Sequence, residues 1–141
     1  MRAFDVVVIG AGNTAMDCLR TARRLGARAR CVYRRTHDEA PARREELRHA
    51  EEEGVDFVWL TTPQSFLGKD KVSHVRSVRI HLGMPDSSGR QAPQEIPDSH
   101  VNVEADLVLK ALGFDAEDLS AAMQAPFDTT KWGTLRVDQK S

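Results

Sequence analysis

The first 35 residues place a glycine turn between two short apolar runs, and this arrangement restricts the fold more than any other feature of the chain. Residues 6–9 form a continuous Val-Val-Val-Ile run, typical of a strand buried on both faces of a parallel sheet. The turn that follows has the pattern G-x-G-x-x-A, and residues 29–33, largely apolar apart from Arg30, predict a second strand. Strand, glycine turn, helix and strand in this order predict an α/β fold with a parallel sheet and a Rossmann-like dinucleotide-binding unit.

The segment between the two runs has the pattern of an amphipathic helix. Its apolar residues recur at the i, i+3, i+4, i+7 spacing of one helix face, and Gly26 follows where such a helix commonly ends. We expect the buried face to consist of Ala15, Cys18, Leu19, Ala22 and Leu25.

The residues of the turn suit a bound pyrophosphate. Gly10 permits the sharp turn out of the strand, and Gly12 has no side chain to keep a phosphate away from the backbone. Asn13 and Thr14 open the helix, where unpaired N–H groups and the positive end of the dipole favour an anion. Ala15 lets the helix pack closely on the strand. A glycine turn alone can join any strand to any helix, but its place in this pattern favours nucleotide binding.

Two arginines follow the second strand at the position that distinguishes NAD from NADP. NAD-binding units usually carry an acidic residue there, which accepts hydrogen bonds from the ribose 2′-hydroxyl. Arg34 and Arg35 cannot accept a hydrogen bond, but each can donate two to a phosphate. At about 1.5–3 kcal/mol for each charge-assisted hydrogen bond, the pair favours NADP over NAD. The alternative is a solvated basic loop.

A second helix is predicted over residues 42–53, with Pro41 suited to its first turn and Gly54 at its end. Arg43 and Arg44 fall in that first turn, where the helix dipole disfavours cations. A bound anion would explain them. Equally, they could cover the surface and pair with glutamates of the same helix.

The middle of the chain changes from helical to strand periodicity. Residues 55–60 predict a third buried strand, and residues 78–82 alternate apolar with polar side chains, as in a strand with one wet face. A further strand lies near residues 101–103. We expect an antiparallel meander that replaces a helical crossover, with turns at residues 68–70 and 83–89, the second of them mobile.

Residues 105–112 predict a final buried strand that runs into a glycine turn. Ligands of open α/β sheets bind beyond the carboxyl ends of the strands, so Ala111 and Gly113 are candidates to line a cofactor site. A plain strand-to-loop glycine is the alternative. The tail predicts a short helix at residues 119–123 and a hairpin or strand at 132–138.

Composition limits the classes of function. The 141 residues suffice for a single domain (1–141), and the net charge of −1 gives no indication of a nucleic-acid or membrane partner. Cys18 and Cys31 fall in the predicted helix and strand, so we expect both to be buried and reduced, and two thiols cannot hold an iron–sulfur cluster. The histidines show no metal-ligand spacing and no stretch is long and apolar enough to span a membrane. We therefore expect no metal and a cytoplasmic protein.

Taken together, these motifs resemble the NADPH-binding domain of the glutamate synthase small (β) subunit, within the wider pyridine nucleotide-disulphide oxidoreductase family. The resemblance is carried by the string at residues 10–18, by Tyr33-Arg34-Arg35, by Arg43-Arg44-Glu45, and by residues 52–55 and 108–114. The resemblance implies that the pyrophosphate is held by Gly10, Gly12, Asn13, Thr14 and Ala15. It implies that Arg34 and Arg35 hold the 2′-phosphate, with Arg43 or Arg44 as helpers. Ala111 and Gly113 would line the nicotinamide side.

In this family the NADPH domain is inserted into a larger FAD domain, and the family's cysteine-rich segment and FAD motifs are absent from these residues. The resemblance therefore implies a fragment that binds NADPH. FAD, and a large glutamate synthase subunit as a partner, would belong to the full-length protein only. No residue is a strong candidate for acid or base catalysis, so the hydride chemistry would belong to the cofactors.

Two other classes of function remain open at this point. One is a non-catalytic NADP(H)-binding regulatory module that uses the same fold. The other, a dehydrogenase acting on its own substrate, needs a second domain for which the chain has no room. Sibling enzymes with other electron acceptors share the motifs, so the resemblance does not fix the acceptor.

Overall fold

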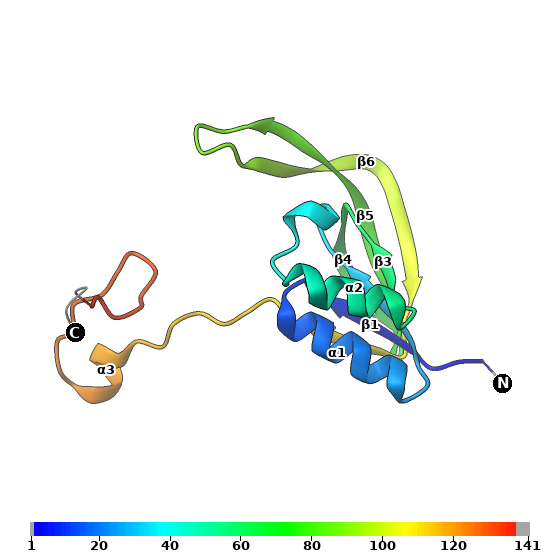
Figure 1. Cartoon of the computed structure of the whole chain (residues 1–141), viewed down its shortest axis with the longest axis horizontal. Coiled ribbons are helices and arrows are strands. Elements are labelled where there is room, and N and C mark those ends of the chain that lie inside the picture. The colour runs from blue at the N-terminus through cyan, green and yellow to red at the C-terminus, as the bar shows by residue number, and fades with distance from the viewer. Residues whose placement is uncertain (1, 138–141) are drawn as a thin grey trace.

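The computed structural model describes residues 2–137. At its centre is a four-stranded parallel sheet with the order β3-β2-β1-β7 (Figure 1), formed by β1 (Asp5–Ile9), β2 (Arg28–Val32), β3 (Asp56–Val58) and β7 (Leu107–Lys110). Helix α1 (Asn13–Arg24) connects β1 to β2, and helix α2 (Arg44–Glu52) connects β2 to β3 after a short 3₁₀ turn, η1 (His37–Glu39). The predicted α/β class and parallel sheet are confirmed.

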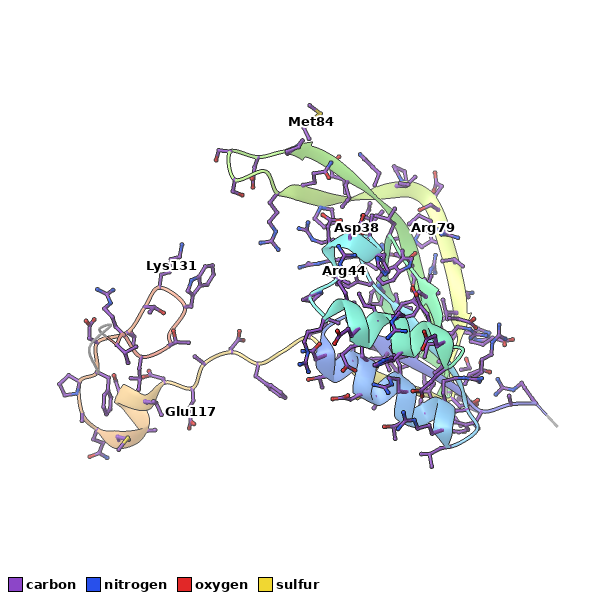
Figure 2. The ribbon with its side chains drawn as sticks, viewed as in Figure 1. Asp38, Arg44, Arg79, Met84, Glu117 and Lys131 are labelled. Carbon is purple, nitrogen blue, oxygen red and sulfur yellow. The ribbon has the colours of Figure 1, made fainter. Side chains whose placement is uncertain are left out.

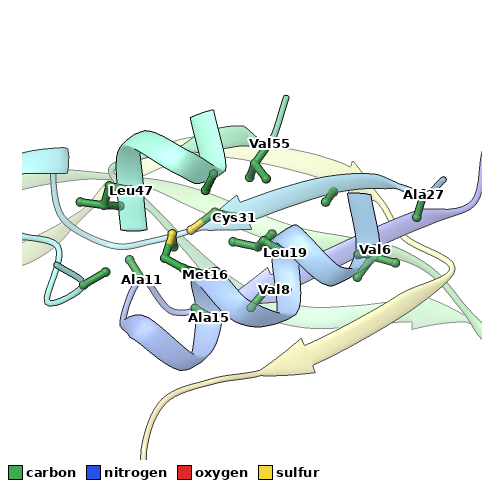
Figure 3. Packing of buried hydrophobic residues seen from close by; sticks show 14 residues of the cluster. Val6, Val8, Ala11, Ala15, Met16, Leu19, Ala27, Cys31, Leu47 and Val55 are labelled. Atoms are coloured by element: carbon green, nitrogen blue, oxygen red, sulfur yellow. The ribbon is translucent and has the colours of Figure 1, made fainter. Parts of the chain in front are cut away.

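Side chains of β1 alternate between the two faces of the sheet, and both faces are covered. Val6 and Val8 pack with residues of α1 and α2 (Figure 3), while Val7 packs with residues of the meander. All three valines are at most 4% exposed. Burial on both faces is the reason that this strand reads as a continuous apolar run in the sequence.

The buried face of α1 differs from the predicted one at its ends. Ala15, Leu19 and Ala22 are buried as expected, but Cys18 is only partly buried. Leu25 is 82% exposed, because the helix ends at Arg24 and the chain turns away there. Met16, which was not among the expected residues, is fully buried in this cluster (Figure 3).

The start of α2 also lies later than predicted. The helix begins at Arg44, with Arg43 as its N-cap residue, so Pro41 precedes the helix and is not in its first turn. Leu47 and Ala50 supply its buried face.

The meander is a separate antiparallel sheet with the order β4-β5-β6, formed by β4 (Thr61–Gly68), β5 (Val72–Pro85) and β6 (Gln91–Glu104). It covers the face of the parallel sheet opposite the helices, where Val75, Val103 and Ala105 pack against Val7 and Val32. The expected meander in place of a helical crossover is therefore present.

The turn between β5 and β6 is tighter than expected. Gly83 lies within β5, and the strands continue up to a turn at residues 86–90. There the Asp86 carboxylate accepts hydrogen bonds from Ser88 and from the Arg90 N–H (2.6–3.0 Å). Met84, beside this turn, points into solvent at the tip of the meander (Figure 2).

After β7 the chain extends away from both sheets to a short helix, α3 (Leu119–Met123), and a turn closed by a bridge between Thr129 and Leu135 (Figure 1). The predicted helix is confirmed. The predicted hairpin falls partly on Asp138, outside the described residues. Within residues 2–137, no helix combines the length and the apolar character that crossing a membrane would require.

Candidate functional site

A cleft of about 730 Å³ opens at the carboxyl ends of the parallel strands. Three chain segments that leave this edge of the sheet contribute to it: the glycine turn after β1, the loop after β2 and the segment after β7. Strand β4 of the meander forms a further wall. The lining residues are Ile9, Gly10, Ala11, Gly12, Asn13, Thr14, Val32, Tyr33, Arg34, Pro41, Thr61, Thr62, Pro63, Lys110, Ala111, Leu112, Gly113 and Phe114.

The first glycine of the turn is required by the protein itself. Gly10 has φ +122°, and a Cβ there would collide with the carbonyl oxygen of Ala111. Its N–H donates to the Val32 carbonyl oxygen (3.1 Å), and its own carbonyl accepts from the Cys31 thiol (3.1 Å). The turn is therefore held by two hydrogen bonds to β2 and closely approached by Ala111, which follows β7.

Cys31 is fully buried in this position, as predicted. Burial raises the pKa of its thiol to about 12, because the thiolate would be stranded in apolar surroundings. The thiol therefore stays protonated at neutral pH and serves as a hydrogen-bond donor to the turn.

The second glycine is not required by the protein. Gly12 has φ −86°, which any residue adopts, and a Cβ there would meet only Pro41, at an ordinary 3.9 Å. It is also the N-cap residue of α1, and no side chain caps that end of the helix. Because Gly12 has no side chain, the part of the cleft next to the uncapped N–H groups of α1 stays open. An anion fits such a position.

The other predicted pyrophosphate residues occupy different environments. Asn13 and Thr14 are exposed and line the cleft. The Asn13 side-chain oxygen accepts a hydrogen bond from the Arg43 N–H at 2.9 Å. Ala15 is fully buried in the core and supports the turn from below, as its proposed packing role requires.

The structure separates the two arginines that follow β2. Arg34 is exposed, lines the cleft and forms no ion pair within residues 2–137. Arg35 does not line the cleft: it is 7% exposed, and its guanidinium donates to Glu39 Oε1 at 3.2 Å. Of the two arginines, only Arg34 therefore faces the cleft, and Arg35 is engaged in holding its own loop.

Glu39 secures this loop from both sides. Its carboxylate also accepts from the N–H and the hydroxyl of Thr36 (3.3 and 3.1 Å). Burial opposes ionisation, but the hydrogen bonds from Thr36 and Arg35 outweigh it and hold the pKa of Glu39 below its ordinary value. Arg35 is therefore neutralised locally, which sequence inspection could not reveal because the partner is four residues away in an irregular segment.

Arg43 and Arg44 lie near the rim but do not line the cleft. Arg44 is exposed and donates to Asp38 Oδ1 at 3.1 Å (Figure 2). This hydrogen bond is the main reason that the pKa of Asp38 is lowered. Arg43 forms no ion pair in the described part of the chain. The partner of Arg44 comes from η1, so the expected pairing with a glutamate of the same helix is not found for Arg44.

The β7 side of the cleft contains both predicted residues. Ala111 donates its N–H to the Ile9 carbonyl oxygen at 2.8 Å, and Gly113 lies two residues further along the lining. Sequence inspection missed Lys110, Phe114, Tyr33, Thr61 and Thr62. Lys110 and Phe114 adjoin predicted site residues and could have been included. Nothing in the sequence places Thr61 and Thr62 there, because their position depends on how the meander docks.

None of the described residues lining this cleft is a carboxylate, an imidazole or a thiol. The lining offers backbone N–H groups, hydroxyls and the cationic groups of Arg34 and Lys110. Such a surface binds and orients an anionic ligand, and it has no acid–base pair of its own.

Comparison with known proteins agrees with this geometry. The chain is 53% identical over 138 residues to the glutamate synthase [NADPH] small chain of Azospirillum brasilense, covering 96% of this chain and 29% of that protein. It is 42% identical over 133 residues to the NADPH-Fe(3+) oxidoreductase subunit beta of Geobacter sulfurreducens, covering 92% of this chain and 20% of that one. The chain therefore spans less than a third of either relative.

Among solved structures, FprA of Mycobacterium tuberculosis in complex with NADPH superposes with a TM-score of 0.69 at 21% identity, over 82% of this chain and 40% of that one. This likeness shows a shared fold. The sequence pattern of the pyridine nucleotide-disulphide oxidoreductases matches residues 2–141. The chain accordingly belongs to the pyridine nucleotide-disulphide oxidoreductase family.

Proposed function

We propose that this chain is the NADPH-binding domain of a flavin-dependent oxidoreductase of the glutamate synthase small-subunit type. Its role is to hold NADPH so that the nicotinamide faces a flavin carried by another part of a longer protein. The chemistry supplied there is hydride transfer from nicotinamide to flavin, and the residues of this chain bind and orient. In this proposal FAD binds to that other part of the protein and not to the residues of this chain.

The main support for the proposal is that one cleft contains both the open glycine turn at Gly12 and the guanidinium of Arg34, which forms no ion pair within residues 2–137. The uncapped start of α1 and the clear space at Gly12 suit a pyrophosphate. Arg34, on the loop after the neighbouring strand, supplies a guanidinium that no described carboxylate neutralises. A dinucleotide with an additional phosphate on its ribose satisfies both features. Ala111 and Gly113 then line the nicotinamide side.

The type of electron acceptor rests on the relatives. The 53% identity to a glutamate synthase small chain favours electron delivery towards glutamate synthesis, with a large subunit as the eventual partner. The iron-reductase relative at 42% identity shows that a similar domain occurs in a protein named for another acceptor. A non-catalytic NADP(H)-binding regulatory module is the second candidate, since the described lining contains no carboxylate, imidazole or thiol.

Calorimetric titration of the purified chain with NADPH and, separately, with NADH tests the proposal. We expect tighter binding of NADPH at low salt, and a preference that shrinks as salt screens the exposed Arg34. Failure to bind either nucleotide, or equal affinity for both, would contradict the assignment.

Substitution of Arg34 identifies the source of the preference. Arg34→Ala should weaken NADPH by about 10- to 100-fold, the equivalent of one charge-assisted hydrogen bond of roughly 1.5–3 kcal/mol, and leave NADH nearly unchanged. Arg28→Ala is the matched control, because it removes the same charge from the opposite end of β2. Arg35→Ala should instead lower thermal stability, because it leaves Glu39 without its cation. An equal loss of NADPH and NADH in the Arg34 variant would exclude the 2′-phosphate role.

A further inference from the structure

Two consecutive backbone N–H groups ahead of α2 donate to the glycine turn. The Ala42 N–H donates to the Ala11 carbonyl oxygen at 3.0 Å, and the Arg43 N–H donates to Asn13 Oδ1 at 2.9 Å. Pro41, which precedes these two residues, lines the same cleft as Gly12 and Asn13. The segment that leads into α2 is therefore fastened directly onto the turn.

Only one of these two hydrogen bonds depends on a side chain. The bond between Ala42 and Ala11 joins two peptide groups and survives any substitution that keeps the backbone in place. The bond to Arg43 requires an acceptor at position 13. Because Arg43 is the N-cap residue of α2, this bond links Asn13 to the residue at which α2 begins.

The oxygen of Asn13 is better suited to the protein than to a ligand. A phosphate at neutral pH offers acceptors and few donors, so an amide oxygen gains nothing from facing it. The same oxygen is already engaged by the Arg43 N–H. Arg43 itself forms no ion pair within residues 2–137, whereas Arg44 is partly engaged by Asp38.

We propose that Asn13 is a positioning residue for nucleotide selectivity: its side-chain oxygen ties the start of α2, and with it the Arg43 guanidinium, to the pyrophosphate-binding turn. The inference rests on the proposed function. Asn13 lines the cleft and Arg43 does not, so the tie holds the start of α2 beside the cleft. In this proposal, the exposed Arg43 side chain reaches the 2′-phosphate from that position. Loss of the tie leaves the turn intact but lets the start of α2 move.

The quantity that tests this role is the ratio of the dissociation constants for NADH and NADPH, measured by calorimetry on the full 141-residue chain. Asn13→Ala removes the acceptor and should lower this ratio by about three- to tenfold, as expected for one hydrogen bond. Asn13→Asp keeps an acceptor for the Arg43 N–H. It should weaken both nucleotides through repulsion of the pyrophosphate, while the ratio stays within about twofold of the original. Circular dichroism checks that both variants are folded.

A double-mutant cycle with Arg43→Ala then tests whether Asn13 influences nucleotide selectivity through Arg43. If Asn13 acts through Arg43, adding Asn13→Ala to the Arg43→Ala chain should change the ratio by less than about twofold. Two results would overturn the inference: an unchanged ratio in Asn13→Ala, which includes an equal weakening of both nucleotides, or the same loss of ratio in the Arg43→Ala background. Failure of the proposed function is distinguishable, because it appears as no NADPH preference in the unsubstituted chain.

Discussion

The turn after β1 and the turn between β5 and β6 both contain a glycine with positive φ, yet their surroundings differ. Gly10 is enclosed: strands β2 and β7 bond to it or touch it, and a Cβ would strike the Ala111 carbonyl. Gly89 stands in the open, with nothing within 4 Å of the position of a Cβ. The Asp86 carboxylate organises that second turn from within its own few residues.

The same contrast extends to the two sheets. Strand β1 is central in the parallel sheet and is buried along its whole length. Strand β6, at the edge of the meander, is exposed over most of its length. The parallel sheet is specified by contacts between distant segments, and the meander tip by local sequence. The two regions should therefore respond differently to the same kind of substitution.

The largest effect is expected from Gly10→Ala. The new Cβ meets a backbone carbonyl that cannot move without breaking the pairing of β1 with β7, and the positive φ adds strain. We expect a loss of about 3 kcal/mol or more in the free energy of unfolding. Chemical denaturation measures it, and a loss below about 1 kcal/mol would mean that the turn is far less constrained than the structure indicates.

Gly12→Val should separate binding from folding. A Cβ at this position would meet only Pro41, at 3.9 Å, and the backbone conformation is ordinary, so we expect the thermal midpoint to fall only slightly. NADPH and NADH should both lose at least about 100-fold in affinity, because the side chain fills the space where the pyrophosphate approaches. Gly12→Ala is the smaller matched change and should lose less. Retained affinity in the valine variant would place the nucleotide elsewhere.

Gly89→Ala is the direct counterpart of Gly10→Ala. It carries the same left-handed strain, but the added methyl group points into empty space. The expected loss is about 1 kcal/mol, with nucleotide affinity unchanged. If Gly10→Ala and Gly89→Ala lower the free energy of unfolding by the same amount, the enclosure of the first turn does not contribute to stability.

The smallest effect concerns acid stability. Glu53, at the end of α2, accepts hydrogen bonds from Arg24 and Arg20 of α1, and these hold the pKa of its carboxyl at about 2. The folded pKa lies below the unfolded value near 4.5, so this contribution is present above pH 4.5 and is lost as the pH falls towards 2. Both partners are near the surface, so high salt should reduce the effect.

Denaturation of the original chain and of Glu53→Gln at pH 7 and pH 3 measures this contribution. The substituted chain should show a weaker acid dependence, and the difference should be smaller than the effect of Gly89→Ala. Identical acid dependence in the two chains would show that the pairing of Glu53 between α1 and α2 does not contribute to stability.

Much of the architecture follows from the sequence alone. The apolar run of β1, the glycine pattern and the spacing in α1 give the βαβ unit, because periodicity reports which side of an element is buried. The position of Arg34 after β2 gives the expected place of a 2′-phosphate, because the chain direction fixes which edge of the sheet it leaves. The alternation in β5 gives the meander.

The sequence could not determine the contacts between segments that are distant in the chain, because the hydrophobic pattern describes each segment separately. Only the tertiary structure shows that Arg35 turns inward to Glu39 while Arg34 stays free, and that Thr61 and Thr62 close the cleft. It alone joins Asn13 to Arg43 and Cys31 to Gly10. The reason is physical: periodicity fixes the burial of each element, whereas the partner of a polar atom depends on how the elements dock.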